Sequence, residues 1–108
     1  MKLSSSALIA PGKIKDYLLS QRKRNDKSKW LAKAGYSLNN WQQLEIDLRA
    51  QILSLDAVLI DKSIYGNIFE IRGILHGPNG NFLEVCTIWM IEHKSKLTKF
   101  ITMYPGKK

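Results

Sequence analysis

The chain has 108 residues and 44% apolar side chains, which is enough for one domain and too little for two. It carries a formal charge of +8 at pH 7, and its single cysteine excludes an internal disulfide framework and a cysteine-rich zinc site. The N-terminal apolar stretch, residues 7–10, is too short for a signal peptide or a membrane span. We therefore expect a single domain over residues 1–108, soluble and cytoplasmic, with no membrane association.

Three helices are expected in the first half of the chain, about residues 11–54. A short helix over 11–20 begins with a proline, which suits the first helical position. A second short helix starts near residue 27 and ends at a glycine, and a longer third helix over 37–54 is capped by a serine. The positions predicted to face the core are Ile14, Tyr17, Leu18, Trp30, Leu31, Ala34, Trp41, Leu44, Leu48 and Ile52. Glu45 and Asp47 are expected on the outer face of the third helix.

The second half of the chain, about residues 57–104, is enriched in β-branched and aromatic residues. The predicted strands cover residues 57–62, 68–76, 82–91 and 97–104. Turn sequences, Tyr65-Gly66-Asn67 and Gly77-Pro78-Asn79-Gly80, separate the first three strands. Helices followed by such a meander predict an α+β domain. We expect the two short helices and the longer one to pack on one face of a four-stranded antiparallel sheet.

Alternation along the strands predicts which side chains face the helices. The predicted core side collects Phe69, Ile71, Leu75, Cys86, Ile88, Met90, Ile101 and Met103. The predicted opposite side collects Glu70, Arg72, Thr87, Trp89, Thr102 and Tyr104, with Val85, Ile91 and Phe100 among them. Cys86 is thus interpreted as a small core hydrophobe. The alternative for Trp89 and Tyr104 is packing beneath the N-terminal segment.

Positive charge is concentrated at the two ends of the chain. Residues 13–33 hold eight Lys and Arg against two acids, and residues 94–108 hold five lysines and no acid. If folding joins these ends, they form one basic surface that attracts polyanions. A basic rim around an aromatic sheet face suits single-stranded nucleic acid. The residues expected to bind RNA are Arg24, Lys29, Trp89 and Lys99.

Each charged candidate also has a structural interpretation. Lys27 and Lys29 lie near the start of the second predicted helix, where they either meet a phosphate or form a solvated charged face. Arg72 lies two residues from Glu70 on the same side of a strand. It is therefore either a phosphate clamp or half of a structural ion pair.

Metal and cofactor sites are not expected. His76 and His93 fall at strand ends or turns, and neither has a Cys, His or paired carboxylate at the spacing of metal ligands. The glycine-containing turn at 77–80 lacks the lysine and the following helix of a nucleotide-binding loop.

Several short motifs resemble one family. They are Asp16-Tyr17-Leu18-Leu19, Lys27-Ser28-Lys29-Trp30-Leu31 leading to Gly35-Tyr36, Tyr65-Gly66, Gly77-Pro78-Asn79-Gly80, Thr87-Ile88-Trp89 and Tyr104-Pro105. Together they are similar to an uncharacterised family of small bacterial proteins, whose members occur alone or as C-terminal domains of larger toxin-like proteins. The order of elements is similar to the barnase, EndoU, colicin and RelE class of metal-independent ribonuclease toxins, which work on the open face of the sheet.

The resemblance implies roles only at matching positions. Lys27 falls on the lysine of the family motif, Thr87 and Trp89 on the third-strand motif, and Tyr104 on the last strand. Many family members carry a histidine just before the motif lysine, where this chain has Asp26. The departure leaves Lys27, Arg72 or Tyr104 to transfer protons or to stabilise charge.

The leading hypothesis is a toxin-like ribonuclease of a bacterial toxin–antitoxin pair, whose partners are RNA and a small acidic antitoxin-like protein. In the expected reaction, the 2′-hydroxyl of the RNA attacks the adjacent phosphate, and no metal is required. The candidate catalytic residues are Lys27, Arg72, Thr87, Thr102 and Tyr104. One alternative is a non-catalytic nucleic-acid-binding module that uses the same surface. Another is a protein-interaction domain, an antitoxin or adaptor whose basic face meets an acidic protein.

Overall fold

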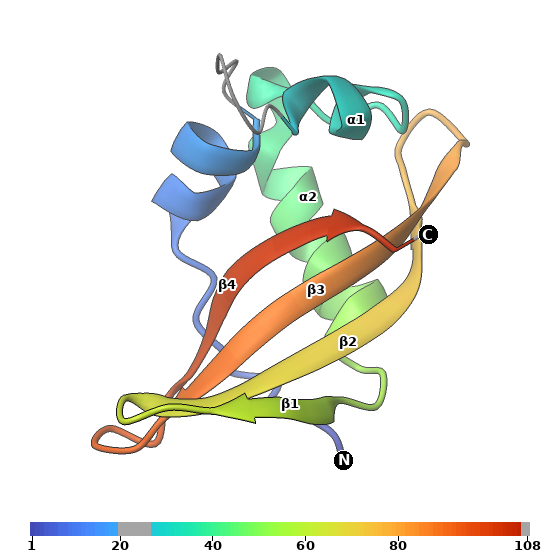
Figure 1. Ribbon diagram of the computed structural model, residues 1–108. Helices are drawn as coiled ribbons and strands as arrows, with labels where there is room; N and C mark the ends of the chain where they lie inside the picture. Colours follow the sequence, from blue (N-terminus) through green and yellow to red (C-terminus); the bar gives the residue numbers. More distant parts are fainter. Residues whose placement is uncertain (20–26, 107–108) are drawn as a thin grey trace.

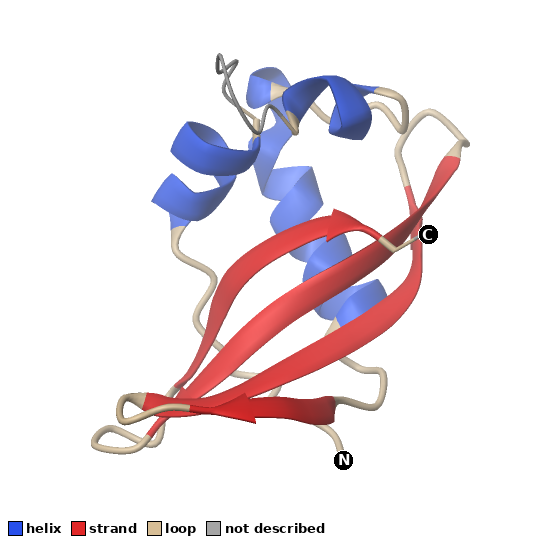
Figure 2. Ribbon diagram, viewed as in Figure 1, coloured by secondary structure: helices blue, strands red, loops and turns tan. Residues whose placement is uncertain are grey.

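The computed structural model describes residues 1–19 and 27–106, and it contains helical segments followed by a four-stranded sheet (Figures 1 and 2). The helical segments are η1 (Lys13–Leu18), α1 (Ser28–Ala32), η2 (Leu38–Asn40), α2 (Trp41–Asp47) and η3 (Leu48–Ile52). The strands are β1 (Val58–Lys62), β2 (Gly66–His76), β3 (Phe82–Glu92) and β4 (Thr98–Pro105). The α+β class predicted from the sequence is confirmed. Within the described residues, no helix has the length and apolar character needed to cross a membrane.

The predicted long third helix is built from η2, α2 and η3, which follow one another without a break. Ser37 caps its start in an extended conformation, and its backbone N–H donates to Oδ1 of Asn40 over 2.7 Å. The helix before it ends as predicted, because Gly35 has φ of +95°, a conformation in which a β-carbon is disfavoured.

The sheet has the strand order β1-β2-β3-β4, and each neighbouring pair is antiparallel. In Figure 1, α2 and η3 cross behind the sheet, whereas η1 and α1 lie beside β4. The buried helical residues Leu44, Leu48 and Ile52 belong to the same hydrophobic cluster as the buried residues of the strands. The sheet therefore has one side packed on α2 and η3. The other side is called the open face below.

The predicted alternation is wrong in β3. Phe69 of β2 lies opposite Trp89 and Ile71 lies opposite Thr87, so these β3 side chains point into the core. Cys86, Ile88 and Met90, which were expected to face the helices, lie on the open face, although Cys86 is fully buried there by its neighbours. Since residues on both sides of β3 are largely apolar, hydrophobicity alone did not determine which set is buried.

Burial of Thr87 is possible because its hydroxyl is fully bonded. Thr87 Oγ1 donates to the backbone carbonyl of Ile71 over 2.9 Å and accepts a 2.8 Å hydrogen bond from Nε1 of Trp89. The indole also packs edge-on against Phe100, with ring centroids 5.2 Å apart. This arrangement satisfies both buried polar groups inside the core.

The alternation predicted for β4 is also wrong at its first half. The register between β3 and β4 shifts at Ile88 and Trp89, so that Trp89 pairs with Phe100 and Ile88 pairs with Thr102. Ile101 is the extra residue and is only half-buried, while Phe100 and Met103 both enter the core. A β-bulge of this kind breaks the two-residue period on which the prediction depends.

Asp47 is a further exception, because it is buried rather than on the outer face of the helix. Its carboxylate accepts hydrogen bonds from the hydroxyl of Tyr36 at 2.6 Å and from Nε2 of Gln43 at 2.9 Å. The pKa of Tyr36 is raised above its ordinary value, mainly by burial and also by the hydrogen bond to Asp47. Glu45 is half-buried and pairs with Arg49 one turn later.

The turn between β2 and β3 docks against the C-terminal end of α1. The side chains of Asn79 and Asn81 both donate to the carbonyl of Lys33, at 3.1 and 3.0 Å. A β-carbon on Gly77 would overlap the carbonyl oxygen of Ala34. The Gly-Tyr and Gly-Pro-Asn-Gly motifs thus form one contact that holds α1 on the sheet.

We predict that Gly77→Ala destabilises the fold by about 1–3 kcal/mol, because the added methyl group forces the turn away from α1. Gly12→Ala is the matched control, since Gly12 has helical φ of −61° and room for a β-carbon. The control should be neutral or slightly stabilising. Urea unfolding measures both, and an unchanged Gly77→Ala would show that the docked turn contributes nothing to stability.

We also predict that Thr87→Val costs about 1–3 kcal/mol, because it leaves the buried indole N–H of Trp89 without an acceptor. The same substitution should cost less in a Trp89→Phe background, where that donor is absent. Urea unfolding of the four proteins gives the coupling between the two residues. Equal costs in both backgrounds would contradict a stabilising bond.

Candidate functional site

The open face carries two rows of side chains across β2, β3 and β4. In the first row Arg72 lies opposite Cys86, which lies opposite Tyr104. In the second row, Glu70, Ile88 and Thr102 are aligned in the same way. Directly opposed residues in an antiparallel sheet share a side, and so do residues two apart on a strand. All six side chains therefore belong to the open face.

Glu70 joins the two rows through its carboxylate. Arg72 Nε donates to Oε1 at 2.9 Å, and the Cys86 thiol donates to Oε2 at 3.1 Å. The hydrogen bond from Cys86, followed by that from Arg72, lowers the pKa of Glu70. A second guanidinium nitrogen of Arg72 donates to the carbonyl of Gly106 at 3.0 Å, while half of the side chain remains exposed. Arg72 is thus positioned from both sides and still accessible.

The environments of the Cys86 thiol and the Tyr104 phenol both favour the neutral form of these groups. Burial is the main cause of the raised pKa of Cys86. The hydrogen bond with Cys86 is the main cause of the raised pKa of Tyr104, and burial adds to it. Near pH 7 the Tyr104 phenol therefore keeps its proton, and the ring itself remains partly exposed.

A second polar cluster lies at the edge of β4 and involves the helical segments. Lys27 Nζ donates to the hydroxyl of Tyr17 and to Oγ1 of Thr102, both at 3.0 Å. Tyr17 and Thr102 are themselves joined by a 3.1 Å hydrogen bond. The ammonium groups of Lys27 and Lys13 lie 4.9 and 5.6 Å from the centroid of the Tyr17 ring.

This environment favours the phenolate form of Tyr17. The hydrogen bond with Thr102 is the largest cause of its lowered pKa, followed by the bond from Lys27, and burial opposes both. The two accessible phenols of the site, Tyr17 and Tyr104, therefore have pKa values displaced in opposite directions.

The two clusters are neighbours on the sheet. Thr102 and Tyr104 are two residues apart on one strand, which corresponds to about 7 Å. Glu70 and Arg72 lie two strands away from them, or about 10 Å across the sheet. Two cationic groups, one carboxylate and two phenols thus lie on or beside the same part of the open face.

The structure brings four of the predicted catalytic residues together, namely Lys27, Arg72, Thr102 and Tyr104. Thr87 and Trp89 are different, because both are fully buried in the core. Contrary to the expectation, Trp89 has no accessible surface on which a base could stack. Thr87 is likewise inaccessible to a bound ligand.

The remaining predicted RNA-binding residues do not join the cluster. Lys99 lies on the open face, but its Nζ is paired with Glu92 at 3.0 Å. Lys29 is exposed on α1 and makes no hydrogen bond or ion pair with a described residue. Arg24 lies outside the described residues.

Sequence reasoning missed three members of the site. Tyr17 was assigned to the buried stripe of a helix, although a tyrosine in such a stripe often has its hydroxyl at the margin of the core. Cys86 was missed because the two faces of β3 were predicted the wrong way round. Glu70 was considered only as the partner of Arg72, and the thiol that also bonds it could not be inferred without the register.

The described residues contain no group of three or more His, Cys, Asp or Glu side chains arranged to hold a metal ion. Comparisons with curated proteins and with solved structures gave no match. One family profile, described as a domain of unknown function (DUF6883), matches residues 2–107. The match spans nearly the whole chain, and this protein therefore belongs to the DUF6883 family.

Proposed function

We propose that this protein is a metal-independent ribonuclease that acts on its open face, as the toxin-like member of a bacterial toxin–antitoxin pair. The observation that supports this most directly is the convergence of Lys27, Tyr17 and Thr102 with Arg72 and Tyr104. Groups of this kind are sufficient for RNA cleavage by an internal nucleophile. That reaction needs a base, an acid and cations at the phosphate.

In the proposed reaction the RNA 2′-oxygen forms a bond to the adjacent phosphorus, and the bond from phosphorus to the 5′-oxygen breaks. Displaced pKa values identify acid and base partners. Tyr17, whose pKa is lowered, accepts the 2′-hydroxyl proton as phenolate. Tyr104, whose pKa is raised, donates its proton to the leaving 5′-oxygen. The products are a 2′,3′-cyclic phosphate and a 5′-hydroxyl.

The reaction also requires that the negative charge on the phosphate be stabilised. Lys27 lies beside the phenol that serves as the base, and Arg72 is in the row of Tyr104. In this proposal both cations contact the phosphate oxygens while Thr102 orients Tyr17. With Trp89 in the core, the partly exposed Tyr104 ring is one aromatic surface on this face that a base can contact.

The neutralising partner in this proposal is a small acidic protein that binds the same cations. A formal charge of +8 favours fast association with an acidic partner. Such a partner would cover Lys27 and Arg72 and so exclude RNA.

A second candidate is a non-catalytic nucleic-acid-binding module. The observation that favours it is the bonding of Arg72, which already donates to Glu70 and to the Gly106 carbonyl. In this alternative, Arg72 and Glu70 form a structural pair and only the remaining cations meet phosphates. RNA binding is expected to weaken steeply with salt for a ribonuclease and for a non-catalytic module alike. The presence or absence of cleavage products therefore distinguishes the two candidates.

We predict cleavage of a short single-stranded RNA in the presence of EDTA, with 2′,3′-cyclic phosphate ends, and no cleavage of the same sequence as DNA. Lys27→Gln should reduce the rate by about 10²-fold or more, because it removes a cation from the developing charge. Lys62→Gln is the matched control, since Lys62 is an exposed lysine on β1 at the opposite edge of the sheet.

The control should cleave at close to the wild-type rate, since both variants lose the same charge. Intact RNA with the wild-type protein, together with salt-dependent binding, would favour the non-catalytic module. Equal loss in both lysine variants would indicate general electrostatic attraction instead of a site at Lys27. Mass spectrometry of the RNA ends provides the measurement.

We predict a bell-shaped dependence of the cleavage rate on pH. The rate rises as Tyr17 loses its proton, below the ordinary tyrosine pKa of about 10, and falls where Tyr104 loses its proton, above that value. Thr102→Val removes the main cause that lowers the pKa of Tyr17, so it should move the rising limb to higher pH.

The ultraviolet absorbance of phenolate gives an independent measurement of the same group. A titration step below pH 10 should be present in the wild type and absent in Tyr17→Phe. A rising limb that is the same in wild type and Thr102→Val would contradict the assignment of Tyr17 as the base.

A further inference from the structure

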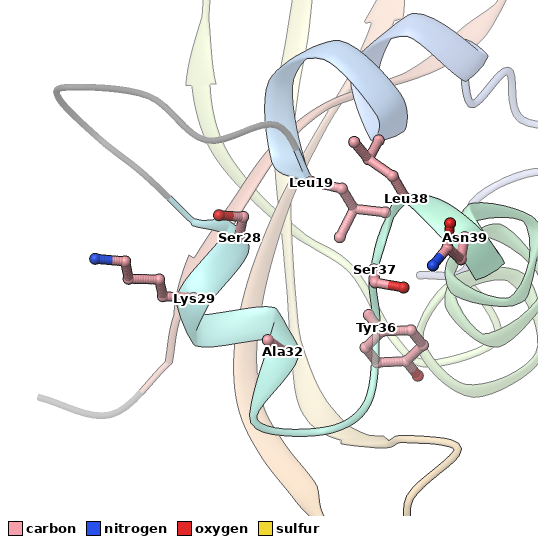
Figure 3. Close-up of a pocket in the computed structure, with 8 residues that line it drawn as sticks. All are labelled: Leu19, Ser28, Lys29, Ala32, Tyr36, Ser37, Leu38 and Asn39. Carbon is pink, nitrogen blue, oxygen red and sulfur yellow. The ribbon is translucent and has the colours of Figure 1, made fainter.

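A pocket of about 520 Å³ opens between α1, the end of η1 and residues 36–39 (Figure 3). Its volume lies within the range of about 300–1,000 Å³ that is common for small-ligand sites. Part of its wall is apolar and comes from Leu19, Ala32 and Tyr36. Leu38 also lines it, and this side chain is half-exposed at the pocket. The apolar part suits a flat heteroaromatic ring.

The wall formed by residues 36–39 is held in place from the interior. The Tyr36 hydroxyl is bonded to the buried carboxylate of Asp47, which fixes the ring that lines the pocket. Asn40 bonds both to the backbone N–H of Ser37 and to the carbonyl of Gly35. A pocket with fixed walls loses little conformational entropy when it is filled.

The polar part of the lining can bond a base and its phosphate. The Asn39 side chain lines the pocket and is exposed, and its amide has both a donor and an acceptor for the edge of a base. Lys29 also lines the pocket, and its ammonium group extends outward from α1 at the margin of the pocket (Figure 3). Neither side chain has a hydrogen bond with another described residue, so both can bond a ligand at no cost to the fold.

The pocket and the open-face cluster share two short segments of chain. Lys27 reaches Thr102 on β4, and Ser28 and Lys29, the next two residues, line the pocket. Tyr17 bonds Thr102, and Leu19 lines the pocket two residues later. Consecutive Cα atoms are 3.8 Å apart. The same two short segments therefore border both sites.

We propose that this pocket binds one nucleotide, its base between the apolar walls and its phosphate at Lys29, adjacent to the phosphate cleaved at Lys27 and Tyr17. This inference rests on the proposed ribonuclease function and assigns its base-recognition subsite. It also explains how a base is bound although Trp89 is buried.

The test is titration of the full chain with nucleoside 5′-monophosphates of adenine, guanine, cytosine and uracil, followed by NMR of the backbone amides. The corresponding nucleosides and inorganic phosphate are the reference probes. We expect at least one monophosphate to bind saturably and to shift the amides of residues 28–39. Its nucleoside and inorganic phosphate should each bind more weakly, because each lacks half of the contacts.

Ala32→Trp fills the pocket from an exposed helical position and should weaken binding of that monophosphate by about fivefold or more. Ala50→Trp is the matched control, since Ala50 is an exposed alanine on η3 and does not line the pocket. Asn39→Ala, which removes an exposed amide without adding volume, should also weaken binding while leaving the unfolding midpoint unchanged.

The proposal is overturned if the monophosphates shift amides elsewhere, or if Ala32→Trp and Asn39→Ala bind like the Ala50→Trp control. Cleavage measurements keep this result apart from the ribonuclease proposal. RNA cleavage with normal kinetics in both pocket variants would reject the subsite and retain the function. Nucleotide binding in the pocket without any RNA cleavage would retain the binding site and reject the catalytic assignment.

Discussion

The hydrogen-bonded pair of Trp89 and Thr87 is the constraint on which the rest of the site depends. The indole N–H bonds the threonine hydroxyl, which in turn bonds the carbonyl of Ile71 on β2. Because side chains alternate along a strand, burying this pair places Cys86 on the opposite side of β3. The thiol is then available to Glu70 and Tyr104. The polar network of the open face is thus a consequence of which β3 residues enter the core.

The edge strand β4 connects this network to the helical half. Thr102 bonds side chains from η1 and from the start of α1, whereas Tyr104 lies in the row of Arg72. Thr102 and Tyr104 lie about 7 Å apart on this single strand. Thr102 bonds the phenol of Tyr17, and the pKa values of Tyr17 and Tyr104 are displaced in opposite directions. Such a difference is typical of sites that transfer two protons in one reaction.

Much of the fold was predictable, because its elements have strong local signals. The turn glycines, the serine cap and the β-branched runs gave the three helices and four strands with bounds close to those observed. The face of β3 was not predictable, since Val85 and Ile91 are as apolar as Ile88 and Met90. Nor was the bulge beside Ile101, which no residue type marks. Of the candidate site, the sequence pointed to Lys27, Arg72, Thr102 and Tyr104, whereas Tyr17, Glu70 and Cys86 required the three-dimensional register.

The docking of α1 has a consequence for the site as a whole. A helix of five residues has almost no stability in isolation, so α1 depends on what holds it. Two asparagine amides from the β2–β3 hairpin donate to the carbonyl of Lys33 at its C-terminal end. Lys27 immediately precedes the first residue of α1. The hairpin therefore helps to fix the position of the Lys27 ammonium group from a distance. A substitution in this loop can therefore displace Lys27 from Thr102 without contacting either residue.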